Sequence, residues 1–328
     1  MNQIKKIVKK IPFLSKIRNE FVLLKEYYYD YKIFKSNYMF SKKNINKVEY
    51  NILLNVHGIE KGLSNKNIRF FGENKVKQLI EDLEYCSKNK DSFAYAIGIS
   101  ALHTYKKICE KNNWTDKEIY KIVCEFILKS DFKDEKRIGT EIYNKKALLK
   151  GTKFDYFSFV SSRHSVRNYS ESKIKNDDIN KAIEIAIKTP TACNRQMIKV
   201  YNVENSELKK FIFKIGQGFS GFELDNASLF IITYDINANY FNGERNQGML
   251  NAGLFSMNFV NGLHSLGIGS CFVQFGNSSK DEKKIKAMCH IPVNERIAVF
   301  IAAGYYSENS IIPLSSRKSL FDIYKKIN

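Results

Sequence analysis

The chain has 328 residues, a net charge of +19 and 44% hydrophobic residues, which is enough for two domains with packed cores. Its six cysteines form no C-x-x-C pair, which argues against a structural zinc site. No run of about 18 apolar residues is present to span a membrane. Residues 1–18 lack the apolar region of a secretory signal peptide, so we expect a cytoplasmic protein with reduced thiols.

The positive charge is strongest near the N-terminus, where residues 1–48 carry 12 basic and 3 acidic side chains. Only 9 of the 53 basic residues are Arg, the better bidentate ligand for phosphate and guanine, so we expect no nucleic-acid binding. Apolar residues recur at helical spacing in 1–48, interrupted by Pro12. This pattern predicts either weak contact with an anionic membrane surface or acidic partner, or a helix packed on its own domain with a solvated Lys face.

Residues 1–150 are expected to form a basic, mostly helical domain of unknown role. The apolar spacing predicts helices over about 50–62, 75–89, 93–111 and 115–129. Thr115 and Glu118 have the spacing of a capping box, which predicts that Thr115 starts the last of these helices.

From Phe154 onward helices and strands alternate. Helices are expected over about 177–188, 206–215, 246–266 and 280–289, and strands over 199–203, 228–234, 268–275 and 296–305. Ser206 is the expected cap of its helix. This order predicts an α+β domain over residues 151–328, with one mixed sheet covered by helices on both faces.

Residues 161–170, SSRHSVRNYS, are called the basic motif here. It brings Arg163, His164, Ser165 and Arg167 within five positions. Guanidinium groups and a hydroxyl so close together suit the oxygens of a phosphate. A short basic run can equally be a solvated face, and this motif alone does not separate the two interpretations.

Residues 189–196, TPTACNRQ, are called the amide strip here, and they follow a predicted helix that Pro190 would end. The small side chains of Thr191 and Ala192 leave room for a flat ligand near the backbone. Asn194 and Gln196 add amide groups able to bind a heterocycle edge. The simpler alternative is a helix end followed by a turn.

Two more segments complete the pattern. In SLGIGSCFVQFGN, residues 265–277, the glycines precede the strand, so the segment is not a G-x-G-x-x-G dinucleotide fingerprint. The last apolar strand ends in Gly304-Tyr305, and Arg317 follows about a dozen residues later.

The order Arg-His-Ser-x-Arg, Pro-Thr-x-x-Asn-x-Gln, Leu-Gly-x-Gly-Ser and Ala-Gly-Tyr with a late Arg resembles the nitroreductase family of FMN proteins, over roughly residues 154–328. The sequence departs from the family at Met197-Ile198, where Pro-Trp is usual after the Gln, and at Tyr306, where Pro is usual. The resemblance implies a homodimer that binds FMN at its subunit interface. The expected core of that interface is the apolar helix over 246–266, with Leu250, Leu254, Met257 and Val260.

The resemblance also implies roles for single residues. The cofactor-binding residues would be Arg163, His164, Ser165, Arg167, Pro190, Thr191, Asn194, Gln196, Gln274, Phe275 and Arg317. The basic motif and Arg317 would hold the phosphate side, and the amide strip would reach the flavin from the second subunit. The backbone N–H near Gln274 would point at flavin N5. No metal is implied.

The implied activity is an FMN-dependent oxidoreductase that uses NADH or NADPH on a small molecule, by ping-pong hydride transfer through flavin N5. The reverse direction, dehydrogenation by the flavin, is equally open, and loops 219–226 and 236–244 would shape the substrate pocket. The alternative is a flavin-binding or degenerate module that acts as an interaction protein in a surface-polysaccharide pathway.

The N-terminal half contains HGIEKGL, residues 57–63, which resembles an extension on some nitroreductase-like chains encoded near surface-polysaccharide genes. His57, Glu60 and Lys61 share one face of a predicted helix. They are either acid–base or binding groups, or a polar cluster that fixes the turn at Gly62.

Overall fold

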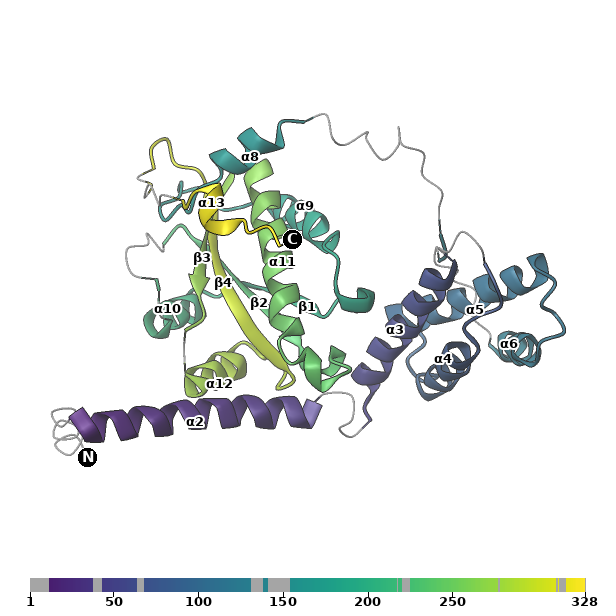
Figure 1. Ribbon diagram of the computed structural model, residues 1–328. Helices are drawn as coiled ribbons and strands as arrows, with labels where there is room; N and C mark the ends of the chain where they lie inside the picture. Colours follow the sequence, from purple (N-terminus) through teal and green to yellow (C-terminus); the bar gives the residue numbers. More distant parts are fainter. Residues whose placement is uncertain are drawn as a thin grey trace.

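The computed structural model describes residues 12–37, 43–63, 68–130, 138–140, 154–216, 218–219, 225–276, 278–310, 312 and 317–327 (Figure 1). Three expectations fall partly or wholly outside these ranges: the domain junction near residue 150, residues 1–11 and 38–42 of the basic segment 1–48, and residues 220–224 of the predicted pocket loop.

The N-terminal half is helical, as expected. Its helices are α2 (Pro12–Asn37), α3 (Ile45–Leu63), α4 (Glu73–Tyr85), α5 (Phe93–Lys111) and α6 (Glu118–Lys129). Helices α3 to α6 share a core that includes Ile52, Leu79, Leu102 and Val123. Since this core is built from their own residues, α3 to α6 form one helical domain.

Thr115 does not cap α6, because it lies in a turn and the helix begins three residues later. The residue in the cap position is Lys117, which makes no side-chain cap hydrogen bond. The capping-box prediction for Thr115 was therefore wrong.

The second half is an α+β unit. Its longer elements are α8 (Tyr156–Ser162), α9 (Asn176–Ile187), β1 (Ile198–Val203), α10 (Ser206–Ile215), β2 (Ser228–Asp235), α11 (Gln247–Ser265), β3 (Ile268–Gln274), α12 (Ser279–Met288), β4 (Glu295–Tyr305) and α13 (Leu320–Ile323). Three short 3-10 turns are η2 (Ala192–Asn194), η3 (Ile236–Ala238) and η4 (Asn242–Glu244). The cap of α10 is Asn205 rather than Ser206, since its side chain accepts from the Leu208 N–H at 2.9 Å.

The four strands form one sheet in the order β1-β2-β4-β3, and neighbouring strands run antiparallel. An isolated parallel bridge joins Ser165 to Ser270 on the outer side of β3. Side chains of β2 alternate between two cores: Phe230 and Ile232 face one, Leu229 and Ile231 the other.

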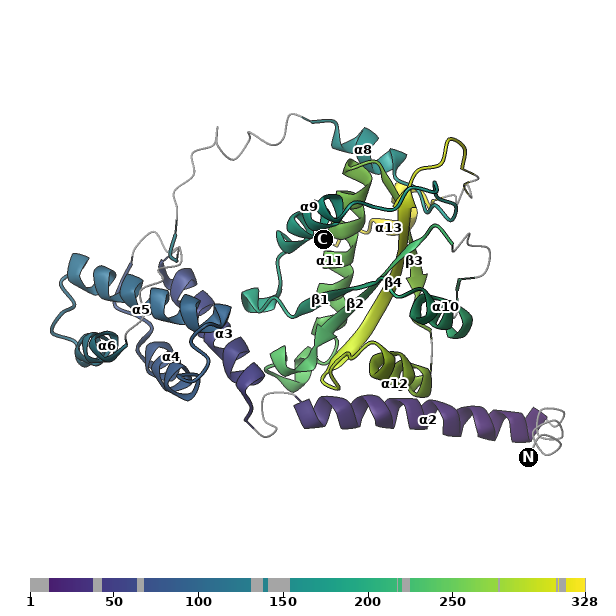
Figure 2. The same ribbon diagram turned by 180° about the vertical axis from the view of Figure 1, so that it is seen from behind.

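Helices cover both faces of this sheet (Figures 1 and 2). Helices α9 and α11 close one core, and α10 and α12 close the other. Helix α9 crosses α11 closely, because a Cβ on Gly262 would lie 3.1 Å from the backbone of Ala182. The expected fold class, an α+β sheet covered on both faces and preceded by helices, is confirmed.

Helix α2 belongs to the N-terminal half by sequence but packs on the second unit (Figure 1). Ile33 and Phe34 lie against the core under α11. Glu26 accepts from the Ser279 N–H at 2.8 Å, and Asp30 pairs with Arg296 at 2.8 Å. The described part of the basic segment therefore packs on its own protein, and its contact with a membrane or acidic partner stays a prediction.

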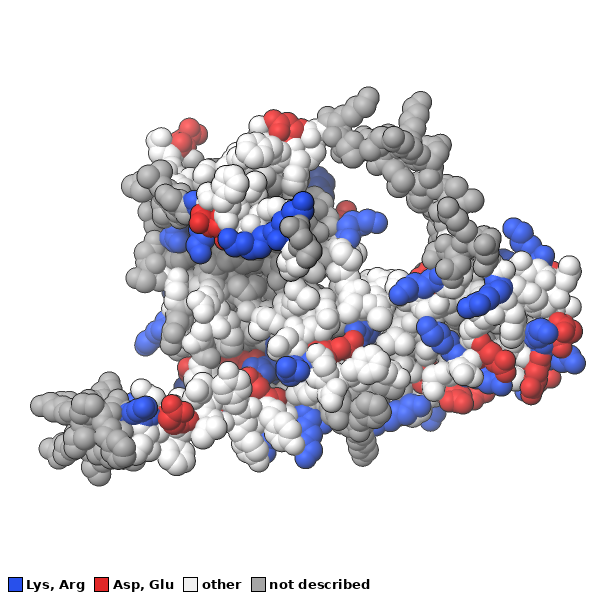
Figure 3. All heavy atoms as spheres, in the orientation of Figure 1, with Lys and Arg blue, Asp and Glu red and all other residues white. Residues whose placement is uncertain are grey.

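The face of the helical domain drawn in Figure 3 carries no single basic patch. Figure 3 shows Lys and Arg interspersed with Asp and Glu over α3 to α6. Within the described residues, no helix is both long and apolar enough to cross a bilayer. The cytoplasmic setting stays a prediction.

Candidate functional site

The basic motif lies where α8 ends and the chain joins the edge of the sheet. Arg163 follows α8 directly, and the Val166 N–H donates to the Ser270 carbonyl at 3.1 Å. This anchor buries Val166 completely while His164 stays exposed. Among the described residues, Arg163 forms no ion pair, so its positive charge is available to an anion.

His264, near the end of α11, is a neighbour of the basic motif that the sequence pattern did not reveal. Its Nδ1 lies 2.8 Å from the Tyr306 hydroxyl and its Nε2 lies 2.9 Å from the Ser162 hydroxyl. Burial, and then the positive charge of Arg163, lower the pKa of His264. The imidazole is therefore neutral at pH 7, and the positive charge of this corner comes from the arginines.

Cys271 lies beside the same motif from strand β3. Burial raises the pKa of its thiol, while Arg167, the Ser165 hydroxyl and Arg163 oppose that rise. Arg163, Ser165 and Arg167, three of the four predicted residues of the motif, thus lie near Cys271 at the edge of the sheet. Within the described residues, no group of three His, Cys, Asp or Glu is arranged to hold a metal ion.

The amide strip connects α9 to β1 and turns sharply. Cys193, Asn194 and Gln196 have φ values of 51°, 52° and 50°, a left-handed conformation that L residues other than Gly rarely adopt. The turn is closed by the Gln196 N–H, which donates to the Thr191 hydroxyl at 3.0 Å. As a result Pro190, Asn194 and Gln196 are exposed on the surface of the strip.

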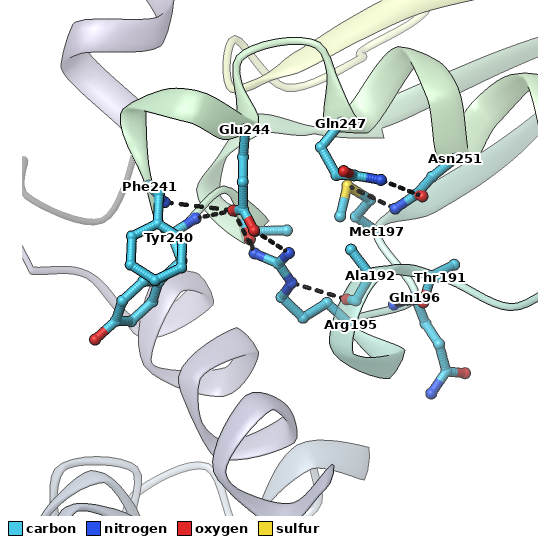
Figure 4. A network of polar contacts seen from close by, with 11 residues as sticks. Thr191, Ala192, Arg195, Gln196, Met197, Tyr240, Phe241, Glu244, Gln247 and Asn251 are labelled. Carbon is cyan, nitrogen blue, oxygen red and sulfur yellow. Dashed lines mark hydrogen bonds and ion pairs between the residues drawn. The ribbon is translucent and has the colours of Figure 1, made fainter. Parts of the chain in front are cut away.

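Arg195, between two exposed amides, points inward and is only 1% exposed. Its Nη1 and Nη2 donate to the two carboxylate oxygens of Glu244 at 2.8 Å and 2.7 Å. It also donates to the carbonyls of Ala192, at 2.9 Å, and Ala238. Figure 4 shows this guanidinium joining the strip to the 236–244 loop.

Glu244 is held in turn by its own loop. One carboxylate oxygen accepts from the backbone N–H of Tyr240 at 2.6 Å. Burial raises the pKa of Glu244, but the hydrogen bonds from Arg195 and Tyr240 outweigh it, and the pKa is lowered from 4.5. Glu244 is therefore ionised at neutral pH. Neither Arg195 nor Glu244 was identified from the sequence, because they are 49 positions apart and no motif joins them.

Helix α3 of the helical domain packs against both η2 and η3, so it covers one side of the strip. The Tyr50 hydroxyl from α3 lies 3.3 Å from the Asp235 carboxylate. A pocket of about 340 Å³ opens between α3, the N-terminus of α5 and the sheet, and Gln196, Lys199 and Asp235 are among its lining residues. The helical domain thus reaches the predicted site.

His57, Glu60 and Lys61 lie elsewhere on α3. His57 Nδ1 is 3.7 Å from Glu60, whose carboxylate also accepts from the Gly139 N–H at 3.5 Å. These contacts fit a polar cluster that holds the chain beyond α6 against α3. A binding role for the three residues stays a prediction.

The glycine-containing segment 265–277 lies mainly on β3, an edge strand. Gln274 is exposed, and Phe275 packs against Phe300 with ring centroids 5.5 Å apart. Arg317 is exposed just before α13. The role of Arg317 in phosphate binding stays a prediction.

The basic motif and the amide strip lie at opposite ends of the sheet in one chain. Ser165 bridges to Ser270 of β3, which pairs with Ala303 of β4. Ala303 pairs in turn with Ser228 at the start of β2. Met197, which ends the strip, is bonded to Asp235 at the other end of β2. Seven residues of a strand span about 20 Å. A ligand that touched both motifs of one chain would have to cross a sheet face that helices cover.

An open groove of about 1030 Å³ lies between α2 and α11. Leu250, Leu254 and Met257 of α11, expected at a dimer interface, are 58%, 47% and 39% exposed. Val260, expected there too, lies instead in the core with no exposed surface, because it is on the face of α11 that packs on the sheet. The apolar exposed face of α11 is therefore narrower than the sequence indicated.

Comparison with known proteins finds one matching family model and several similar structures. The model of the Nitroreductase family matches residues 160–225 and 219–305. The chain is similar to the structure of an FMN-dependent nitroreductase from Clostridium difficile, with 21% identity over 52% of this chain and 99% of that chain, at a TM-score of 0.45. It is similar to a nitroreductase family protein from Streptococcus pneumoniae, with 22% identity over 53% and 100% of the two chains, at a TM-score of 0.44. No curated protein matches the chain.

Proposed function

Residues 160–305 form a domain of the Nitroreductase family, and from this membership we propose that the chain is an FMN-dependent oxidoreductase acting on a small molecule, with NADH or NADPH as electron donor. The observation that carries the proposal is the placement of the two polar motifs. A basic corner in which Arg163 forms no ion pair among the described residues and a strip of exposed amides are the two kinds of surface that a flavin mononucleotide requires.

The residues present fit FMN. Arg163, His164, Ser165 and Arg167 supply charge and a hydroxyl for the phosphate and ribityl side. Asn194 and Gln196 supply amides for the ring edge, and Pro190 and Thr191 line it. Gln274, Phe275 and Arg317 complete the proposed set. The chemistry that bound FMN supplies is reversible two-electron hydride transfer.

We propose a homodimer because one chain holds the two motifs at opposite ends of its sheet. If the basic motif of one subunit meets the amide strip of its partner, each dimer has two flavin sites. The exposed apolar residues of α11, Leu250, Leu254 and Met257, supply a plausible contact surface. An obligate interface would bury more than about 2,000 Å².

We also propose that residues 1–150 and 151–328 act as two domains in the cytoplasm. The separate core of α3 to α6 supports this division, and the docking of α2 on the second unit shows that the two are in contact. The helical domain would then shape the substrate pocket from the α3 side, where Gln196 lines the 340 Å³ pocket.

The test uses the purified full chain. We expect flavin absorbance that NADH or NADPH bleaches, FMN as the nucleotide released by heat, and a dimer by light scattering. A colourless protein that does not take up added FMN would overturn the proposal. Release of FAD would overturn the cofactor assignment alone.

A further inference from the structure

Arg195 is an unusual residue for a surface turn. It has the largest of the side chains buried to less than 2% exposure, yet both its neighbours in sequence are exposed. A guanidinium is removed from water at a high cost and is tolerated only where its donors are satisfied. Here the Nε, Nη1 and Nη2 groups all have acceptors, on Ala192, Ala238 and Glu244.

The backbone around Arg195 is strained. Cys193, Asn194 and Gln196 all have φ values near 50°, in a segment of four residues without a glycine. Left-handed non-glycine residues cost free energy and persist only where the surroundings enforce them. Three hydrogen bonds close the turn: from the Asn194 N–H to the Thr191 carbonyl at 2.9 Å, from the Arg195 N–H to the Ala192 carbonyl at 3.2 Å, and from the Gln196 N–H to the Thr191 hydroxyl at 3.0 Å. All three lie within the strip, so its attachment to the rest of the protein needs another constraint.

The guanidinium provides that constraint from inside the turn. By bonding the Ala192 carbonyl it fixes the first residue of the turn to the fourth. By bonding both oxygens of Glu244 it fixes the turn to a loop whose carboxylate is itself held by the Tyr240 N–H. A bidentate pair restrains direction as well as distance, which a single lysine contact does not.

We propose that Arg195, through Glu244, is the positioning residue that holds the amide strip in its left-handed conformation and so presents Asn194 and Gln196 to the flavin. The proposal rests on FMN binding at this strip. Arg195 itself contacts no flavin atom, because its side chain is turned into the protein. The same pair joins the strip to residues 236–244, a predicted substrate loop, so a change in that loop is transmitted to the cofactor side through one ion pair.

The first test compares the wild-type full chain with Arg195→Lys. Lysine keeps the charge but cannot bond both oxygens of Glu244 and the Ala192 carbonyl together. We expect FMN to bind at least about tenfold more weakly. We also expect faster hydrogen exchange at the amide of Gln196, which bonds Thr191 in the closed turn. Unchanged exchange and unchanged FMN affinity in a folded variant would overturn the proposal.

A second variant tests the proposal even if Arg195→Lys fails to fold. Arg195→Met combined with Glu244→Leu replaces the buried pair by apolar side chains, a change that is often neutral for stability. It keeps the core filled but removes the directional bonds, so we expect a folded chain with weakened FMN binding. Full FMN affinity in this double variant would contradict the proposal.

A rescue experiment separates positioning from general stability. Cys193→Gly allows the positive φ without a steric penalty, so the loss caused by Arg195→Lys should be smaller in that background. The matched control is Asn113→Gly, a left-handed residue at 57° in the helical domain, which should give no rescue. Equal losses in all three backgrounds would overturn the role. If the wild type binds no FMN, the proposed function fails, while hydrogen exchange at Gln196 still decides on the role of Arg195.

Discussion

Arg163 in the basic motif and Arg195 in the amide strip lie in opposite environments. Arg163 is half-buried and has no ion-pair partner among the described residues, so its charge is available to an anion. Arg195 is almost fully buried and its donors are used by the protein. Arginine therefore recognises the ligand in the basic motif and holds the backbone conformation in the amide strip.

Arg163→Ala should weaken FMN binding by about 2–4 kcal/mol, because it removes one partner of a charge-assisted phosphate contact and leaves the other unpaired. Flavin fluorescence titration measures the affinity. Arg69→Ala, at an exposed arginine of the helical domain, is the control and should have no effect. Equal affinities of Arg163→Ala and wild type would show that the basic motif does not contact the cofactor.

The lowered pKa of Glu244 predicts that the stability of the fold depends on pH. Since its pKa is lowered in the folded chain, its pair with Arg195 stabilises the fold fully above about pH 4.5 and is lost as the pH falls through the lowered value. The difference in melting temperature between wild type and Glu244→Gln should be constant near neutral pH and vanish on strong acidification. A difference that grows as the pH falls would have the wrong sign for this explanation.

Among the residues of the proposed site, the sequence pattern identified those that are exposed and missed the buried pair. Asn194 and Gln196 belong to a contiguous motif and are exposed, as a ligand contact requires. Arg195 stands in the same motif, but its role depends on Glu244, 49 residues later, and on the closure of a loop. A local pattern carries no information on such a partner.

Among the elements, α2 shows how a segment distant in sequence becomes part of another unit. Arg296 of β4 reaches Asp30 on α2 and Glu282 on α12, at 2.8 Å and 2.9 Å. The ring of Tyr29 lies 5.3 Å from the same guanidinium, measured to its centroid. One buried cation thus joins a helix of the N-terminal half to the sheet and to α12.

The two partners of Arg296 should contribute unequally. Arg296→Met leaves Glu282, which is 1% exposed, as an unpaired buried charge, and should cost about 3–5 kcal/mol of unfolding free energy. Asp30→Asn removes a partner that is 52% exposed and should cost about 0–1 kcal/mol. Urea unfolding of both variants measures the two costs. Comparable losses would contradict the assignment of the main role to Glu282.

The bounds of most elements were predicted within a few residues, because the apolar periodicity of α9, α11 and the strands matches their burial. Their caps were predicted less well. Asn205 and Ser206 are both suitable cap residues, and only the backbone conformation decides that Asn205 accepts the hydrogen bond. The docking of α2 was open from sequence alone, since its apolar residues fit a membrane surface and a protein surface equally.

For the molecule as a whole, the structure shows two units that touch through α2 and α3. The helical domain has its own core, while Ile33, Phe34 and Tyr50 lie against the core of the second unit. The alternation of helices and strands predicted the α+β unit. It did not predict that α3 would pack on η2 and η3, since no pattern in the sequence relates the two segments.

A chain that begins near Lys150 tests the independence of the two units. We expect it to be soluble and to bind FMN, because the proposed cofactor residues lie after residue 160. Its affinity should be lower than that of the full chain, because α3 no longer covers the amide strip. Flavin absorbance and size-exclusion chromatography measure both properties. Aggregation, or complete loss of FMN, would mean that α2 and α3 are part of the core of the second unit.

The separation of the two motifs has a consequence for mixtures of defective subunits. If each site takes its basic motif from one chain and its amide strip from the other, a dimer of Arg163→Ala with Arg195→Lys contains one doubly damaged site and one intact site. Random reassortment of two such chains would restore about a quarter of all sites, although neither parent protein has a normal one. Complementation in a mixed preparation would therefore show that the cofactor site is shared between subunits. If every site belonged to a single chain, mixing would restore nothing.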